Sequence, residues 1–179
     1  MPDAQALTPN LFKRNLAQGK KQLGLWLALD SPFATEILAG SGADWLLLDL
    51  EHSCIDLGQV VHHLRAAKGG TAEMLVRVPW NDAVLFKRLL DVGVRSFMVP
   101  MVQSAQEARA VVAATRYPPQ GIRGAAGNTR ASDPNRRYPV NATSFKNVFA
   151  APWYFDRAIN PFCCAVCAAR IETLFTGQI

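Results

Sequence analysis

One pattern occurs four times along the chain and limits the folds available to it. A short apolar run is followed each time by a segment with helical periodicity, which ends at glycine or proline. The apolar runs cover residues 23–29, 44–50, 73–79 and 95–102. Each run is apolar on both faces, which is typical of a strand buried in a parallel sheet. The repeat therefore predicts strand–helix units that build either a doubly wound sheet or a (β/α)8 barrel.

Capping residues predict where the helices begin and end. Ser31 followed by Pro32 indicates a helix start, because serine caps a helix and proline suits its first position. We expect Asn81 to cap the helix that follows the third run. Residues 104–107 form a capping box and open a helix that should run through Tyr117. No G-x-G-x-x-G turn follows any of the runs, which disfavours a dinucleotide-binding sheet.

Composition narrows the classes of protein further. With 50% hydrophobic and 18% charged residues, the chain can bury a core instead of staying disordered. It has no uncharged apolar run of about 18 residues that could span a membrane, and residues 1–22 lack the apolar core of a signal peptide. We therefore expect a cytoplasmic protein with no membrane partner. The net charge is +5, and the scattered arginines suit a small anionic substrate better than nucleic acid.

Three of the four cysteines form a cluster, namely Cys163, Cys164 and Cys167. Thiolates at this spacing can bind a metal. A structural zinc site usually has four ligands in two pairs, however, and the sequence contains no second pair. We therefore expect these cysteines to be buried in a strand.

Polar residues follow the predicted strands at the point where each strand ends. Asp49, Glu51 and His52 end the second apolar run, Arg77 ends the third, and Gln103 follows the fourth. In parallel α/β folds, ligands bind at the carboxyl ends of the strands. A single residue of this kind is equally well explained by a surface ion pair or a structural histidine. Their recurrence at equivalent positions favours a binding or catalytic site.

The residue types in this group favour carbonyl chemistry. Histidine titrates near neutral pH, so His52 suits proton transfer, and a neighbouring carboxylate could orient its ring. Arg77 offers a permanent charge and a planar fork to a carboxylate or an oxyanion. The pair fits proton abstraction beside a carbonyl, or aldol cleavage through an enolate. The lysines fall in predicted helices, turns and the N-terminal segment, so we expect no Schiff-base lysine and favour an enolate stabilised by a metal.

Six ordered motifs between about Leu23 and Ser132 carry a family resemblance. They read GLWLAL, SGADWLLLDLEH, VRVPWND, KRLLDVG, VPMVQSAQEA and TRYPPQGIRG. The chain thereby resembles the HpcH/HpaI family of metal-dependent (class II) 2-keto acid aldolases, which cleave 4-hydroxy-2-oxo acids to pyruvate and an aldehyde. The resemblance implies a (β/α)8 TIM barrel, a Mg²⁺, Mn²⁺ or Co²⁺ ion, no nucleotide, and a homo-oligomer, either a hexamer or a trimer.

The resemblance also implies a role for each matching residue. His52 would be the general base and act through water, and Asp91 of the LLDVG motif would pair with it. Arg77 would bind the carbonyl side of pyruvate and stabilise the enolate. Trp26 and Gln103 would line the substrate site.

The resemblance becomes weaker beyond residue 132. Glu172 would be a metal ligand, and residues 163–173 would form the fifth strand. Residues 133–162 do not match the family, and the Gly-Pro-x-Asp-Leu-Ser motif that carries the second metal ligand is absent from the sequence. A (β/α)8 barrel typically needs about 250 residues. We therefore expect one incomplete barrel domain over residues 1–179, truncated after about the first five strands.

Two alternatives stand beside an aldolase of sugar acid or aromatic compound catabolism. A catalytically impaired remnant or interaction module would keep the pyruvate-binding arginine and lose the metal, because a hard divalent ion needs several oxygen ligands. A CoA-thioester lyase of the citrate lyase β-subunit type would share the barrel and the metal site. The DLEH and YPPQGIRG motifs fit the aldolases better.

Overall fold

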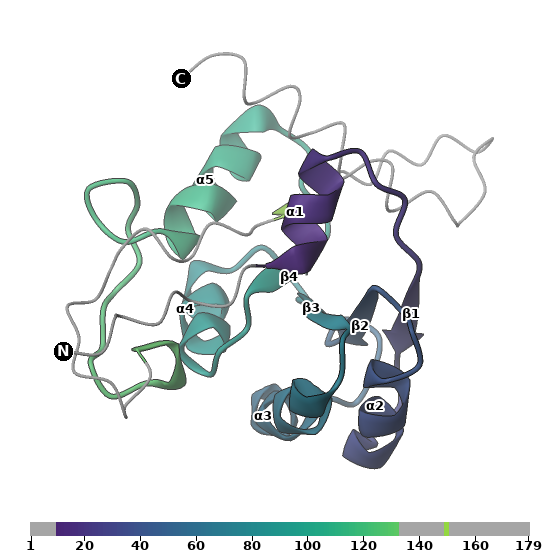
Figure 1. Cartoon of the computed structure of the whole chain (residues 1–179). Coiled ribbons are helices and arrows are strands. Elements are labelled where there is room, and N and C mark those ends of the chain that lie inside the picture. Colours follow the sequence, from purple (N-terminus) through teal and green to yellow (C-terminus); the bar gives the residue numbers. More distant parts are fainter. Residues whose placement is uncertain (1–9, 133–148, 151–179) are drawn as a thin grey trace, which may run out of the picture.

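The computed structural model describes residues 10–132 and 149–150 (Figure 1). Over these residues the helices are α1 (Leu11–Ala17), α2 (Pro32–Ala39), α3 (Leu57–Ala66), α4 (Ala83–Asp91) and α5 (Ala105–Thr115). The strands are β1 (Gly24–Leu27), β2 (Trp45–Asp49), β3 (Glu73–Arg77), β4 (Ser96–Val99) and β5 (Phe149–Ala150). Two short 3-10 helices are η1 (Ala67–Gly69) and η2 (Arg130–Ser132).

The strands form one parallel sheet in the order in which they occur along the chain, β1-β2-β3-β4-β5. An order without reversal is the arrangement found in the wall of a barrel, whereas a doubly wound sheet reverses its order at a switch point. In the register of β2 and β3, Asp49 lies beside Arg77. The predicted parallel α/β fold is confirmed.

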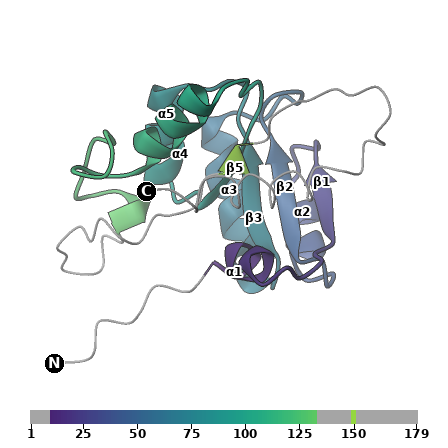
Figure 2. The same ribbon diagram turned by 90° about the horizontal axis from the view of Figure 1, so that it is seen from above.

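Both faces of the sheet are buried at β2, β3 and β4, as the apolar runs predict, whereas the middle of β1 is exposed. On β2, Leu46 and Leu48 belong to the core cluster that the strands share with α2, α3, α4 and α5. Leu47 lies between them in sequence but packs on the other face, with Leu75 and with Phe12 of α1. Figure 2 shows α1 and α3 on opposite sides of the strands. Alternate residues of one strand therefore face different layers, because successive side chains point to opposite faces.

Two helix starts agree with the sequence analysis. The side chain of Ser31 accepts a hydrogen bond at the start of α2, and Pro32 is the first helical residue. Residues 104–107 form the expected capping box at the start of α5. The expected end of this helix is wrong by two residues, since α5 ends at Thr115 instead of Tyr117. The chain turns away because the residue after Thr115 already has an extended backbone.

Two other helix starts were not predicted. The expected cap Asn81 is wrong, because Asp82 caps α4 by accepting a hydrogen bond from the backbone N–H of Val84. Asparagine and aspartate are both good caps, so the residue types alone do not choose between neighbours. Helix α1 has no counterpart in the predicted repeat. It is capped by Asn10, whose side chain accepts a hydrogen bond from the backbone N–H of Lys13.

The structure contains a strand that the sequence analysis did not predict. Strand β5 (Phe149–Ala150) pairs with β4, and it lies inside residues 133–162, which do not match the family motifs. The expected fifth strand, residues 163–173, and its cysteine cluster lie outside the described residues. A two-residue strand lacks the long apolar run by which a buried strand is recognised.

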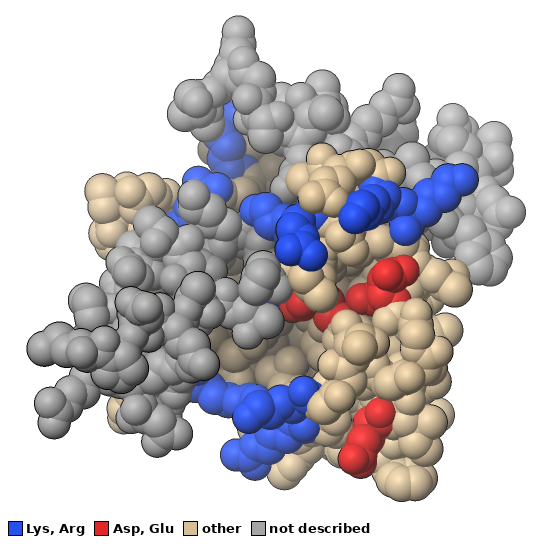
Figure 3. All heavy atoms as spheres, viewed as in Figure 1, with Lys and Arg blue, Asp and Glu red and all other residues tan. Residues whose placement is uncertain are grey.

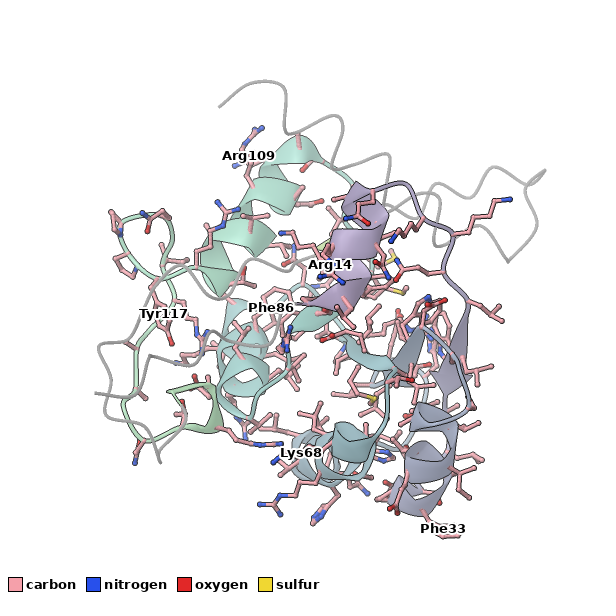
Figure 4. The ribbon with its side chains drawn as sticks, viewed as in Figure 1. Arg14, Phe33, Lys68, Phe86, Arg109 and Tyr117 are labelled. Carbon is pink, nitrogen blue, oxygen red and sulfur yellow. The ribbon has the colours of Figure 1, made fainter. Side chains whose placement is uncertain are left out.

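On the face shown in Figure 3, one group of basic side chains lies around α1 and another beside η1, and acidic side chains lie in the region between these groups. Arg14 of α1 and Lys68 of η1 belong to these two groups (Figure 4). The basic charge of this face is thus divided into separate patches. Over the described part of the chain, none of the helices has both the length and the apolar character that crossing a membrane requires.

Candidate functional site

The candidate site lies at the carboxyl edge of the sheet, where β2 and β3 end side by side. Asp49 is the last residue of β2 and Arg77 the last residue of β3, and the register of the two strands makes them neighbours. Both side chains are almost completely buried, with exposed fractions of 4% and 6%. The polar end of an otherwise apolar strand is therefore explained by a buried ion pair.

The guanidinium of Arg77 is held by a carboxylate and by an aromatic ring. Its Nε and Nη2 donate to the two carboxylate oxygens of Asp49 at 2.9 and 2.6 Å. This is the two-point geometry that a planar fork makes with a carboxylate. The indole ring of Trp26 lies against the guanidinium, with 4.8 Å between the guanidinium carbon and the ring centre. Arg77 is therefore a fixed cation instead of a mobile one.

Asp49 also organises the turn after β2. Its Oδ1 accepts hydrogen bonds from the backbone N–H groups of Glu51 at 3.0 Å and His52 at 3.3 Å, and Oδ2 accepts from Nε1 of Trp26 at 3.2 Å. Burial by itself raises the pKa of Asp49, but the hydrogen bonds from Arg77, Trp26 and the two backbone groups outweigh it. Together they lower the pKa from 3.8 to about 2. Asp49 is therefore ionised throughout the neutral range.

Glu51 is a site residue to which the sequence analysis gave no role. Its Oε2 lies 3.0 Å from Nη1 of Arg77, and its Oε1 lies 3.7 Å from Nε2 of His52. All three nitrogens of the guanidinium thus face carboxylates. The sequence signal was its position next to the predicted base, two residues after the end of an apolar strand.

His52 lies at the mouth of this group and is open to solvent. Its side chain is 69% exposed, while that of Glu51 is 16% exposed. A buried cation and an exposed imidazole thus share one carboxylate at the strand ends. The placement of His52 and Arg77 at one edge is the arrangement expected from the sequence.

The expected pairing of Asp91 with His52 is wrong within this chain. Asp91 accepts a hydrogen bond from Nη2 of Arg123 at 2.8 Å, and the guanidinium of Arg123 stacks on the ring of Tyr117, with 4.5 Å between the guanidinium carbon and the ring centre. Asp91 is the last residue of α4. Because a helix that follows a parallel strand runs back toward the amino edge of the sheet, this residue lies at the end opposite to His52.

The fourth strand end places two residues near the same edge. Gln103 follows β4 with an exposed side chain, and its backbone N–H donates to the carboxylate of Glu107 at 2.6 Å. Met101, between β4 and Gln103, has a φ of 58°. This left-handed conformation is uncommon for residues other than glycine, asparagine and aspartate. Sequence reasoning missed Met101, because a methionine carries no signal for such a backbone.

The described residues do not by themselves fit a site for a divalent metal ion. Among them, no group of three or more His, Cys, Asp or Glu side chains is placed to hold one. The two carboxylates nearest the candidate site, Asp49 and Glu51, both face Arg77. Divalent ions such as Mg²⁺ prefer several oxygen ligands. The predicted ligand Glu172 lies outside the described residues.

Comparisons with known proteins converge on one family. The family described as HpcH/HpaI aldolase/citrate lyase matches residues 22–132. The chain is 47% identical over 119 residues to a 5-keto-4-deoxy-D-glucarate aldolase of Klebsiella pneumoniae, covering 66% of this chain and 46% of that protein. It is 47% identical over 124 residues to the Escherichia coli K12 protein of the same name, covering 69% and 48%. The chain spans about half the length of the curated relatives it matches.

Two solved structures are similar in fold and in sequence. An HpcH/HpaI aldolase/citrate lyase family protein from Burkholderia cenocepacia superimposes with a TM-score of 0.75 and 38% identity, covering 79% of this chain and 59% of that one. An HpcH/HpaI aldolase from Desulfitobacterium hafniense gives a TM-score of 0.66 and 34% identity, covering 77% and 55%.

Proposed function

The chain belongs to the HpcH/HpaI aldolase/citrate lyase family, and from this premise we propose that it carries part of the active site of a pyruvate aldolase. The proposed reaction is the reversible cleavage of a 4-hydroxy-2-oxo acid to pyruvate and an aldehyde. The observation that carries the proposal is the cluster at the carboxyl edge, where a fixed buried arginine and an exposed histidine share one carboxylate.

Arg77 supplies a fixed positive charge for this reaction. Cleavage of the carbon–carbon bond leaves negative charge on the oxygen of the pyruvate enolate. A cation that is already held in place stabilises such charge without reorganising at the moment of reaction. Asp49 and the ring of Trp26 hold the guanidinium in position. Arg77 therefore binds the oxo acid and stabilises the enolate, with Trp26 and Gln103 lining the site.

His52 supplies the proton transfer. The 4-hydroxyl group must lose a proton as the bond breaks, and histidine is a common side chain for such a proton transfer, either directly or through water. The side chain is exposed, so it can reach a substrate bound at the strand ends. Asp91 of the same chain is paired with Arg123, and its catalytic role stays a proposal that this chain alone does not support.

The substrate class follows from the relatives. Those described above are named 5-keto-4-deoxy-D-glucarate aldolases, so we propose a 2-oxo acid derived from a sugar acid. A divalent ion (Mg²⁺, Mn²⁺ or Co²⁺) bound through Glu172 and a homo-oligomer in the cytoplasm belong to the same proposal. The described residues do not form the metal site, so the roles above are assigned to this chain's own side chains.

The test is pyruvate release from a 4-hydroxy-2-oxo sugar acid, followed by coupling to lactate dehydrogenase and NADH. The full chain, supplied with Mn²⁺, should release pyruvate. His52→Asn should lower the rate by about 10²- to 10⁴-fold, the usual contribution of a positioned base. His62→Asn is the matched control, because His62 is an exposed histidine on α3. Equal rates for the two variants would contradict the role of His52, and bound pyruvate without turnover would favour an impaired remnant.

A further inference from the structure

The side chain of Glu51 lies between Arg77 and His52, the residues to which the proposed function assigns enolate stabilisation and proton transfer. The carboxylate of Glu51 lies 3.0 Å from Nη1 of Arg77 through one oxygen and 3.7 Å from Nε2 of His52 through the other. Its side chain is 16% exposed. A single carboxylate thus connects the buried cation to the exposed base.

Arg77 is held unequally by its two carboxylate neighbours. Asp49 accepts two well-formed hydrogen bonds from it and is itself anchored by Trp26 and two backbone N–H groups. Oε2 of Glu51 lies close to Nη1, yet this buried oxygen forms no well-aligned hydrogen bond with any of the described residues. The contact with Glu51 is therefore the weaker of the two and the one that can be exchanged.

The charge balance works against an anionic ligand as long as Glu51 stays in place. One guanidinium faces two carboxylates, Asp49 and Glu51, so the group has one negative charge in excess. Like charges about 4 Å apart repel each other strongly in a partly buried site. A 2-oxo acid can therefore use Nη1 of Arg77 only when Glu51 moves away from it.

We propose that Glu51 is a displaceable counter-ion and a positioning residue for His52. The oxo acid replaces the Glu51 carboxylate on Nη1 of Arg77, and the released carboxylate turns to Nε2 of His52. Without substrate the base shares this carboxylate with Arg77, and with substrate bound the carboxylate pairs with His52 alone. This inference rests on the proposed function, because it takes a 2-oxo acid as the ligand.

The first test measures pyruvate binding to the full chain by calorimetry. Glu51→Gln keeps the shape of the side chain and removes its charge, so it should bind pyruvate about tenfold more tightly than the wild type, as expected when a nearby like charge is removed. Glu51→Asp keeps the charge and should retain the wild-type affinity. Glu73→Gln is the matched control, since Glu73 is 14% exposed and pairs with Arg95 at 3.6 Å at the amino end of β3.

The second test separates positioning from a structural role. In the aldol cleavage assay, Glu51→Gln should lower KM and also lower kcat, because the oxo acid binds more easily while His52 loses its carboxylate. A purely structural residue would not lower KM when it is replaced. Circular dichroism should show the same folded spectrum for all variants.

The outcomes distinguish this inference from the proposed function. Unchanged or weaker pyruvate binding by folded Glu51→Gln overturns the inference, and so does a variant that binds neither pyruvate nor acetate. If Glu51→Gln binds acetate and pyruvate equally, both more tightly than the wild type, and no cleavage occurs, the displaceable counter-ion stands and the aldolase function fails. If the protein binds pyruvate more tightly than acetate, but Glu51→Gln binds pyruvate no more tightly than the wild type does, the proposed aldolase function stands and Glu51 has no part in it.

Discussion

Replacing Asp49 by asparagine tests whether one buried charge pair organises the carboxyl edge. Asparagine keeps the size of the side chain and an oxygen for the two backbone N–H groups, but it removes the negative charge that faces Arg77. The side chain of Asp49 is 4% exposed. Removing one partner of a buried pair leaves the other charge poorly compensated, which typically costs about 3 to 5 kcal/mol. We expect Asp49→Asn to lower the free energy of unfolding at neutral pH by this amount.

Part of this loss should depend on pH. The pKa of Asp49 falls from 3.8 to about 2 on folding, and each pKa unit corresponds to about 1.4 kcal/mol. The ionised carboxylate therefore contributes about 2 kcal/mol to the free energy of unfolding above its unfolded pKa. Because the folded pKa is the lower one, the contribution is lost as the pH falls from about 4 toward about 2. Roughly half of it is gone at about pH 3.

Urea unfolding of the full chain, followed by far-ultraviolet circular dichroism, measures this contribution. The difference in unfolding free energy between wild type and Asp49→Asn should shrink by about 1 kcal/mol between neutral pH and about pH 3. Asp82→Asn is the control, because asparagine is also a good helix cap, and it should change stability by less than about 0.5 kcal/mol. A wild-type advantage over Asp49→Asn that is the same at both pH values would refute the reasoning.

The remaining predictions concern packing. A Cβ on Gly70 would lie 2.3 Å from the carbonyl oxygen of Ala39, so Gly70→Ala should destabilise the chain by about 1 to 3 kcal/mol. Gly69→Ala should leave the stability unchanged, because a Cβ at Gly69 would have no atom within 4 Å. Equal thermal midpoints for the two variants would contradict the predicted clash. Phe86 is completely buried, so Phe86→Ala should cost about 3 to 5 kcal/mol. Phe33 is 72% exposed and points away from the core (Figure 4), so Phe33→Ala should cost less than about 0.5 kcal/mol. Similar urea midpoints for Phe86→Ala and Phe33→Ala would be inconsistent with the core described above.

Local patterns predicted the strand–helix repeat because their causes are local. A strand buried on both faces needs apolar residues throughout, and the strand containing Leu46, Leu47 and Leu48 shows this directly. A capping box depends on two side chains three residues apart, which the sequence displays as residues 104–107. Strand β5 was missed because two residues carry no periodicity.

The candidate site was predictable to the extent that it depends on strand ends. His52 and Arg77 follow apolar strands, and parallel strands bring their carboxyl ends to one edge. The error over Asp91 arose because a family motif names a residue without saying which residue it meets in the folded chain. In this chain it meets Arg123, which is 32 positions away along the sequence.

The sequence by itself determined the repeat, the parallel α/β class, the family and the edge at which polar residues gather, because these follow from patterns within short segments. Tertiary structure alone decided that Asp49 faces Arg77, since a shift of one residue in strand register would point the side chain to the other face. It also decided that Glu51 bridges Arg77 and His52. Contacts of this kind depend on distances of a few ångströms between segments that are far apart in sequence, and only the packed sheet sets those distances.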